Sequence, residues 1–168
     1  MMMIAMHTPV DGLAWLLFTA LVLYVVSSIA AALRKTTIAW GLLAAGGGCA
    51  LAGWIWRGIQ TGDFATGHAP LQNMYEVFLL MGWGIAPLAA LFRWGLRVRG
   101  AWIDALLGAL VLFPAVFVFD PDKQYLMPAL QSPLFIPHVV VYLLGYLIIV
   151  RAAFSAMGVM VHGTADLA

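Results

Sequence analysis

The stretch MPALQSPLFIPHVVVYLLGY (Met127–Tyr146) changes character at His138. The residues before it include polar side chains and prolines, among them Pro133 and Pro137, whereas the residues after it are apolar (VVVYLLGYLIIV). This change predicts that a membrane helix begins here, with a histidine in its first turn. An imidazole at such a position can be reached by a proton or a metal ion from the water side.

The composition of the whole chain fits a membrane protein. Of its 168 residues, 64% are hydrophobic and only 9% are charged, whereas soluble domains are near half apolar and a quarter charged. The sequence therefore predicts an all-α fold, a polytopic membrane helix bundle that forms one domain over residues 1–168. A net charge of +1 gives no support for a nucleic-acid partner, and the single Cys49 has no partner for a disulfide within the chain.

Five apolar runs are long enough to cross a membrane, for which a helix needs about 20 residues. They cover residues 13–33, 38–59, 76–96, 102–119 and 135–159. Basic residues gather between the first and second runs and between the third and fourth. Because such residues stay on the inner side, the pattern predicts five spans with the N-terminus outside and the C-terminus inside. Arg151, in the later half of the last run, is expected to snorkel toward the same inner side.

The two outer loops are then residues 57–75 and 120–137. Both mix prolines, amides and apolar residues, which suits short segments lying on the membrane surface. Trp54, Trp56 and Tyr125 are expected to lie at this interface as belt aromatics. The inner loops are short and basic, so we expect any function on the outer face.

Two histidines fall on that outer face, and each has two interpretations. His138 is either an axial ligand for a haem iron or another metal, or an interfacial residue that only starts a helix. His68, just before Pro70, is either a second ligand or donor to a haem propionate, or a solvated loop residue. No histidine pair has the close spacing of a zinc site, and no HExxH or CxxC motif occurs.

Charged residues at the outer ends of the helices have simpler interpretations. Glu76 opens the third run after Asn73, where an acid complements the helix dipole and caps free amides. A role for Glu76 in proton handling is the alternative. Arg57 is expected to bind a lipid phosphate in preference to a haem propionate.

Two stretches resemble a known family. The segment GHAPLQNMYEVFLLMGW (Gly67–Trp83) and the segment Met127–Tyr146 are similar, in order and separation, to two segments of the cytochrome c assembly family of CcsA/ResC type. The resemblance covers the N-terminal half of a typical member. It implies a multi-pass protein of the bacterial inner membrane that handles haem b at the outer face during cytochrome c maturation.

The resemblance also implies roles for single residues. His138 falls on an outer histidine of the family that ligates haem, with His68 as a second cofactor-binding candidate. The structural motif residues implied by the two segments are Pro70, Asn73, Tyr75, Glu76, Pro128 and Gln131.

The chain departs from the family in one important respect. The tryptophan-rich haem platform and a second outer histidine follow this histidine in the family, and neither is present here. The resemblance then implies that this chain is a subunit of a split cytochrome c synthetase and supplies one side of its haem site. Its expected partners are membrane lipid, another membrane subunit carrying the platform, and apocytochrome c. Two alternatives stay open: a non-catalytic scaffold subunit of a membrane electron-transfer or photosynthetic complex, and a b-type cytochrome using His68 and His138.

Overall fold

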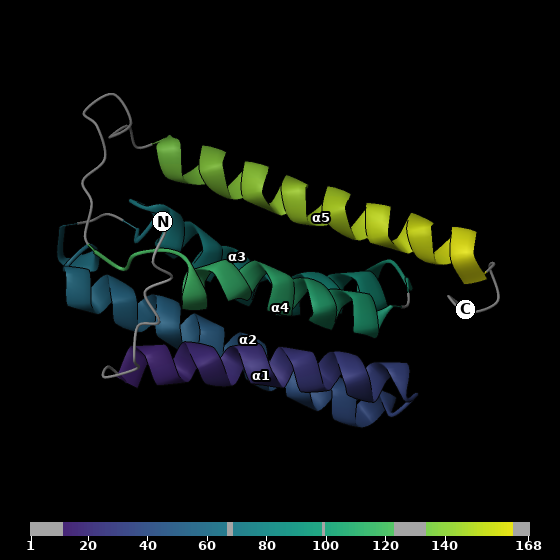
Figure 1. Cartoon of the computed structure of the whole chain (residues 1–168). Coiled ribbons are helices and arrows are strands. Elements are labelled where there is room, and N and C mark those ends of the chain that lie inside the picture. Colours follow the sequence, from purple (N-terminus) through teal and green to yellow (C-terminus); the bar gives the residue numbers. More distant parts are fainter. Residues whose placement is uncertain (1–11, 67–68, 99, 123–133, 163–168) are drawn as a thin grey trace, which may run out of the picture.

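A computed structural model describes residues 12–66, 69–98, 100–122 and 134–162, and these residues form a bundle of long helices (Figure 1). The helices are α1 (Gly12–Ala32), α2 (Thr36–Thr61), α3 (Met74–Ala90), α4 (Ala101–Phe117) and α5 (Phe135–His162). A 3-10 turn, η1 (Phe64–Thr66), follows α2, and a π turn, η2 (Leu91–Gly95), continues α3. No strand occurs in the described ranges, so the predicted all-α helix bundle is confirmed.

Four of the helices have the length and apolarity to cross a membrane: α1, α2, α3 with its π turn, and α5. The helix α4 is apolar but has only 17 residues. In Figure 1 the ends of α2 and α4 lie at the same end of the bundle as the starts of α3 and α5. The loops predicted to share one side therefore do so, while the orientation in the membrane stays a prediction.

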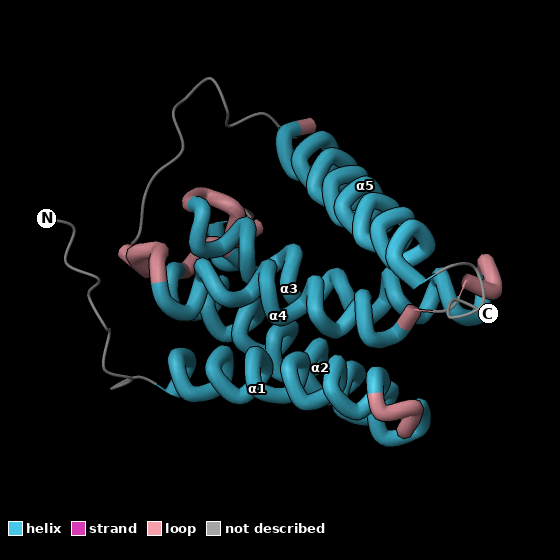
Figure 2. The backbone as a smooth tube through the Cα atoms, turned by 45° about the vertical axis from the view of Figure 1, so that its right-hand side comes forward, coloured by secondary structure: helices cyan, strands magenta, loops and turns pink. Residues whose placement is uncertain are grey.

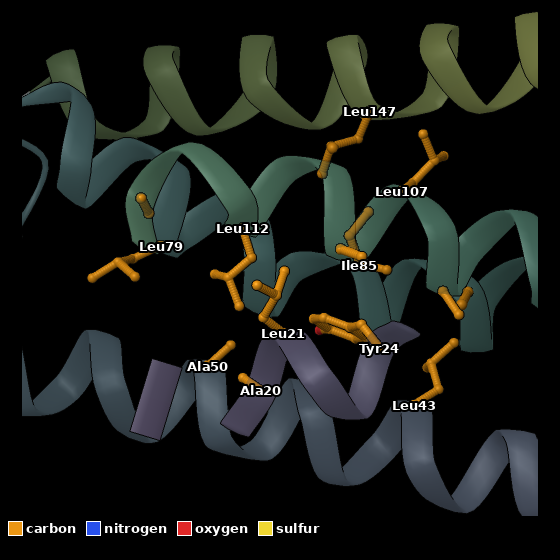
Figure 3. Close-up of a cluster of buried hydrophobic side chains, with 14 of the residues drawn as sticks. Ala20, Leu21, Tyr24, Leu43, Ala50, Leu79, Ile85, Leu107, Leu112 and Leu147 are labelled. Atoms are coloured by element: carbon orange, nitrogen blue, oxygen red, sulfur yellow. The ribbon is translucent and has the colours of Figure 1, made fainter. Parts of the chain in front are cut away.

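The centre of the bundle is organised around Tyr24, whose ring is completely buried (Figure 3). Its hydroxyl donates a hydrogen bond to the Gly82 carbonyl oxygen of α3 at 2.7 Å. Gly46 of α2 and Gly108 of α4 lie against the ring, because a Cβ on either would come within 3.0–3.2 Å of it. Four helices thus meet around one aromatic side chain, and the glycines make room for it.

The helix α5 lies apart from this core (Figures 1 and 2). Only 11% of its most apolar 18-residue stretch is buried, compared with 33–44% for α1, α2 and α3. Among the described residues of α5, only Leu147 belongs to the buried hydrophobic core. The fifth helix is therefore attached to the bundle along a narrow strip.

One buried ion pair fixes the C-terminal half of α5 to the bundle. The Arg151 guanidinium binds the Asp104 carboxylate of α4 through two hydrogen bonds and lies 4.1 Å from the centre of the Phe92 ring. Arg151 is 5% exposed and Asp104 is 4% exposed. The expectation that Arg151 snorkels to the membrane surface is wrong, because a carboxylate within the bundle neutralises its charge.

Candidate functional site

The start of α3 carries three of the residues that the sequence marked as a motif. Asn73 is the N-cap of α3, and its side-chain oxygen accepts the Glu76 backbone N–H at 2.9 Å. Its amide nitrogen donates to the Asp122 carbonyl oxygen at 2.9 Å, beyond the end of α4. Asparagine is favoured at this position because its short side chain reaches the free amides of the first turn. Asn73 thus starts α3 and also joins it to the loop after α4.

Glu76 holds a buried ion pair next to this cap. Its Oε1 lies 3.0 Å from Arg57 Nε, and the Glu76 and Arg57 side chains are 1% and 10% exposed. Its other oxygen accepts the Gln72 backbone N–H at 2.7 Å. The role of Glu76 at the helix start agrees with the structural interpretation, but the ion pair to Arg57 was missed.

Arg57 is surrounded by groups of the chain itself. Besides Glu76, its guanidinium donates to the Pro121 carbonyl oxygen and lies 5.5 Å from the centre of the Tyr75 ring. Arg57 is 8% exposed. The expectation of a lipid phosphate partner is therefore wrong, because Glu76 and Pro121 already occupy the guanidinium.

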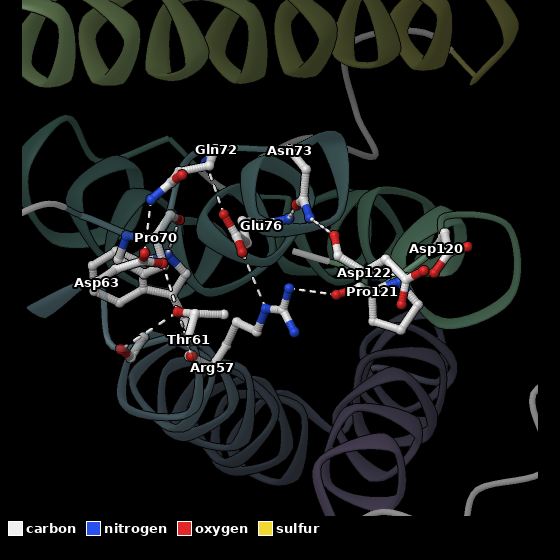
Figure 4. Close-up of polar contacts among 12 residues, drawn as sticks. Arg57, Thr61, Asp63, Pro70, Gln72, Asn73, Glu76, Asp120, Pro121 and Asp122 are labelled. Carbon is white, nitrogen blue, oxygen red and sulfur yellow. Dashed lines mark hydrogen bonds and ion pairs between the residues drawn. The ribbon is translucent and has the colours of Figure 1, made fainter. Parts of the chain in front are cut away.

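The loop between α2 and α3 completes a cluster of polar contacts, which Figure 4 shows. Asp63 is 1% exposed, and its carboxylate accepts from the Gln72 amide at 2.7 Å and from the Thr61 hydroxyl at 2.5 Å. Trp54 donates its indole N–H to the Pro70 carbonyl oxygen at 3.2 Å. Trp54 is therefore hydrogen-bonded within the fold in addition to lying near the expected interface.

We call this set the outer clasp, because it lies at the end of the bundle that the sequence predicts to face outward. It comprises Trp54, Arg57, Thr61, Asp63, Pro70, Gln72, Asn73, Tyr75, Glu76, Pro121 and Asp122. It joins the end of α2, the start of α3 and the loop after α4. Because its polar side chains bind one another and the backbone of the chain, the cluster suits the fixing of loops more than the binding of a cofactor.

His138 occupies a different environment. It lies in the first turn of α5 after Pro137, a position where proline costs no helical hydrogen bond, and its backbone N–H donates to the Leu134 carbonyl oxygen at 3.2 Å. The imidazole is exposed, and the centre of its ring lies 4.6 Å from that of Tyr142. No hydrogen bond or ion pair joins His138 to the outer clasp within the described ranges.

A cavity of about 300 Å³ lies between α3 and α5. Its lining is apolar and consists of Leu80, Met81, Trp83, Gly84, Pro87, Leu88, Leu91, Val140, Leu143, Leu144 and Leu147. His138 is not among these residues. Because Val140 lines the cavity and lies about 200° around the helix from His138, the imidazole points away from it.

The structure thus brings together Pro70, Asn73, Tyr75 and Glu76 and leaves His138 separate. His68, Pro128 and Gln131 lie outside the described residues, as does Tyr125, so the predictions made for them stay predictions. Among the residues that the structure does describe, no group of three His, Cys, Asp or Glu side chains could hold a metal ion.

The sequence analysis assigned no role to two buried acids, Asp63 in the outer clasp and Asp104 in α4. Asp63 follows Gly62, which ends α2 in a left-handed conformation at φ 73°. Asp104 and Arg151 are single charges in separate apolar runs, and charges at membrane depth usually pair with one another. That rule could have found the Asp104–Arg151 pair, since each is the only Asp, Glu, Lys or Arg in its apolar run.

Comparison with known proteins supports the resemblance seen in the two segments. The chain is 36% identical over 87 residues to a cytochrome c biogenesis protein CcsA of Synechococcus sp. (strain JA-2-3B'a(2-13)), a match covering 48% of this chain and 24% of the relative. It is 28% identical over 103 residues to CcsA of Welwitschia mirabilis, covering 58% and 33%. A CcsA of Synechococcus sp. (strain JA-3-3Ab) is 31% identical over 102 residues, covering 56% and 29%.

The matches are partial. The chain spans about a quarter to a third of the length of the curated relatives it matches. No protein-family model matches the chain, and no solved structure matches it. The likeness is therefore to one part of those proteins.

Proposed function

Because the chain is CcsA-like over about half its length, we propose that it acts in cytochrome c biogenesis and presents His138 as an axial haem ligand at the outer membrane face. The observation that carries this proposal is the exposure of the imidazole on the surface of the bundle. His138 is exposed at the start of a mostly uncovered membrane helix, with Tyr142 as its near neighbour.

The residues around His138 fit one side of a haem. A neutral imidazole is a common axial ligand of haem iron. Two exposed apolar residues lie near it along the chain, Leu134 just before α5 and Val141 on α5 (75% and 67% exposed). Such apolar surface suits a porphyrin face. None of the described residues is a second ligand opposite the imidazole, and we propose that a partner subunit completes that side.

The chemistry divides between the haem and the protein. When bound, haem supplies vinyl groups to which the cysteine thiols of an apocytochrome c add, and this reactivity belongs to the haem and the thiols. The contribution of this chain is to hold the imidazole at a fixed place. The outer clasp contributes indirectly by fixing the loops at the same end of the bundle (Figures 1 and 4).

The test compares His138→Ala with Tyr142→Phe in the native membrane. We expect the natural chain to co-purify with low-spin haem. We expect His138→Ala to lose that haem absorption and to lower cytochrome c levels, and Tyr142→Phe to retain both. Restoration by added imidazole would show that the ligand is what was lost. An unchanged spectrum and unchanged cytochrome c levels would refute the ligand role.

A second candidate function is a scaffold subunit of a larger membrane complex. The observation in its favour is that the described motif residues all belong to the outer clasp: Pro70, Asn73, Tyr75 and Glu76. This function predicts that Glu76→Gln, which loosens the clasp, lowers the level of the complex, whereas His138→Ala changes nothing.

A further inference from the structure

The cations in the described part of the chain divide into two groups by what they contact. Arg57 and Arg151 are buried, and each binds a carboxylate. Asp104, the acid nearest to Arg97 in the sequence, is the carboxylate that Arg151 already occupies. The other cations form no ion pair within the described ranges and lie in two turns: Arg34 and Lys35 after α1, and Arg93 and Arg97 in and after η2. We call these four residues the basic end.

The two turns of the basic end are joined by an aromatic contact. Trp40, near the start of α2, and Trp94, in η2, have ring centres 5.2 Å apart. Lys35 comes directly before α2, while Arg93 and Arg97 lie on either side of Trp94 in the sequence. In Figures 1 and 2 both turns lie at the end of the bundle away from the starts of α3 and α5. The sequence predicts that this end faces inward.

Two of these arginines hold a backbone conformation that favours glycine. Arg34 has φ 60° and Arg97 has φ 56°, and each follows the end of a helical segment. Glycine takes such a position without steric cost, and Gly62 does so after α2 at φ 73°. The chain therefore keeps a positive charge at two turns where glycine would fold more easily, and neither charge is paired within the described ranges.

Exposed apolar side chains lie beside the charges. The span formed by α3 and η2 ends at Gly95, just before Arg97. Five apolar residues around the two turns are 54–70% exposed: Leu33, Ile38, Leu91, Trp94 and Leu96. An exposed tryptophan at the end of a span is typical of the boundary between membrane and water. Cations next to apolar side chains at that depth suit a ligand with an anionic head and an apolar tail.

We propose that the basic end binds the phosphate of an anionic phospholipid, whose acyl chains lie along Leu91 and Trp94. Charge complementarity identifies the head group, because arginine binds phosphate through two parallel hydrogen bonds. A soluble phosphate would meet the same cations and leave the apolar side chains beside them uncovered. This surface lies at the other end of the bundle from His138, so the inference does not rest on the haem role (Figure 1).

The experiment places the full chain in phosphatidylcholine vesicles. Electron paramagnetic resonance then measures how strongly the chain binds spin-labelled phosphatidylglycerol relative to spin-labelled phosphatidylcholine. We expect a preference for phosphatidylglycerol of about fivefold or more, the factor for one basic residue near anionic head groups. Arg34→Gly combined with Arg97→Gly should lower this preference to below about twofold. The matched control, Arg34→Lys combined with Arg97→Lys, keeps both charges and should retain the preference.

Glycine suits both positions, so the glycine variant should unfold at a temperature no lower than the natural chain in the same vesicles. Three outcomes would overturn the proposal. The first is equal binding of the two lipids by the natural chain, as expected where another part of the protein already neutralises the cations. The second is an unchanged preference in the glycine variant. The third is loss of the preference when inorganic phosphate replaces chloride at constant ionic strength, which would make the free anion the ligand. The result for His138→Ala is independent of all three.

Discussion

Arg57 Nε lies 3.0 Å from Glu76 Oε1 at the end of the bundle, where both side chains are largely buried. The two residues come from α2 and α3, and 19 positions separate them. Taking two charges out of water costs free energy, which their attraction and further hydrogen bonds must offset. The Gln72 backbone N–H donates to Glu76, and the Pro121 carbonyl oxygen accepts from Arg57. The stability of the outer clasp therefore depends on both partners being present.

Glu76→Gln is expected to lower the free energy of unfolding by about 3–5 kcal/mol, because it leaves the Arg57 charge buried and unpaired. The measurement is denaturation in mixed micelles, followed by tryptophan fluorescence. Arg57→Gln should cost a similar amount, and the double variant should cost clearly less than the sum of the two. Additive losses would show that the two side chains act independently.

Asn73→Ala is expected to cost about 2 kcal/mol, roughly half from the lost helix cap and half from the lost bond to Asp122. Asn73→Ser is the matched variant, because serine keeps the cap and cannot reach the Asp122 carbonyl as the amide does. By the same measurement, Asn73→Ser should lower the free energy of unfolding by about half as much as Asn73→Ala does. Equal effects of the two substitutions would mean that the cap contributes little.

Asp104→Asn is expected to loosen α5 from the bundle while α1–α4 stay packed around Tyr24. The reason is that Arg151 would lose its buried counter-charge, at a cost of about 3–5 kcal/mol to the docking of α5. Spin labels at Leu110 and Ile148, both exposed, would report a broader α4–α5 distance distribution. Asp104→Asn combined with Arg151→Met should narrow the distribution again. Failure of this double variant to do so would show that the ion pair is not what holds α5.

Gly47→Ala is expected to destabilise the bundle by about 1–3 kcal/mol through overpacking, because its Cβ would overlap that of Ala86 in α3. Gly48→Ala is the natural control, since a Cβ there meets nothing within 4 Å. It should be neutral or stabilising by up to about 1 kcal/mol, since alanine favours a helix more than glycine does. Thermal unfolding in the same lipid would separate the two variants, and equal effects would contradict the close approach of α2 and α3.

His138→Ala is expected to leave the unfolding free energy within about 0.5 kcal/mol of the natural chain, as for exposed side chains away from the core. The imidazole contacts Tyr142 on its own helix and has no bond to the outer clasp. Any loss of haem or cytochrome c in this variant then reports the imidazole itself. A large loss of stability would instead show that His138 supports the fold.

The helices and the start of α3 could be predicted from sequence because each depends on residues close together in the chain. An apolar run of about 20 residues needs no distant partner to satisfy its backbone. Asn73 and Glu76 mark a helix start through contacts three residues apart. For the same reason the change at His138 located the start of α5.

Only the tertiary structure decided what the buried charges bind. Arg57 was expected to meet lipid and Arg151 to reach the membrane surface, yet each binds a carboxylate, 19 and 47 positions away respectively. The narrow attachment of α5, and with it the direction of His138, also depends on how helices pack. The amino-acid sequence by itself determined which segments leave water, because that follows from local apolarity. Which charges then pair inside the bundle follows from distances between helices, and no local pattern contains those.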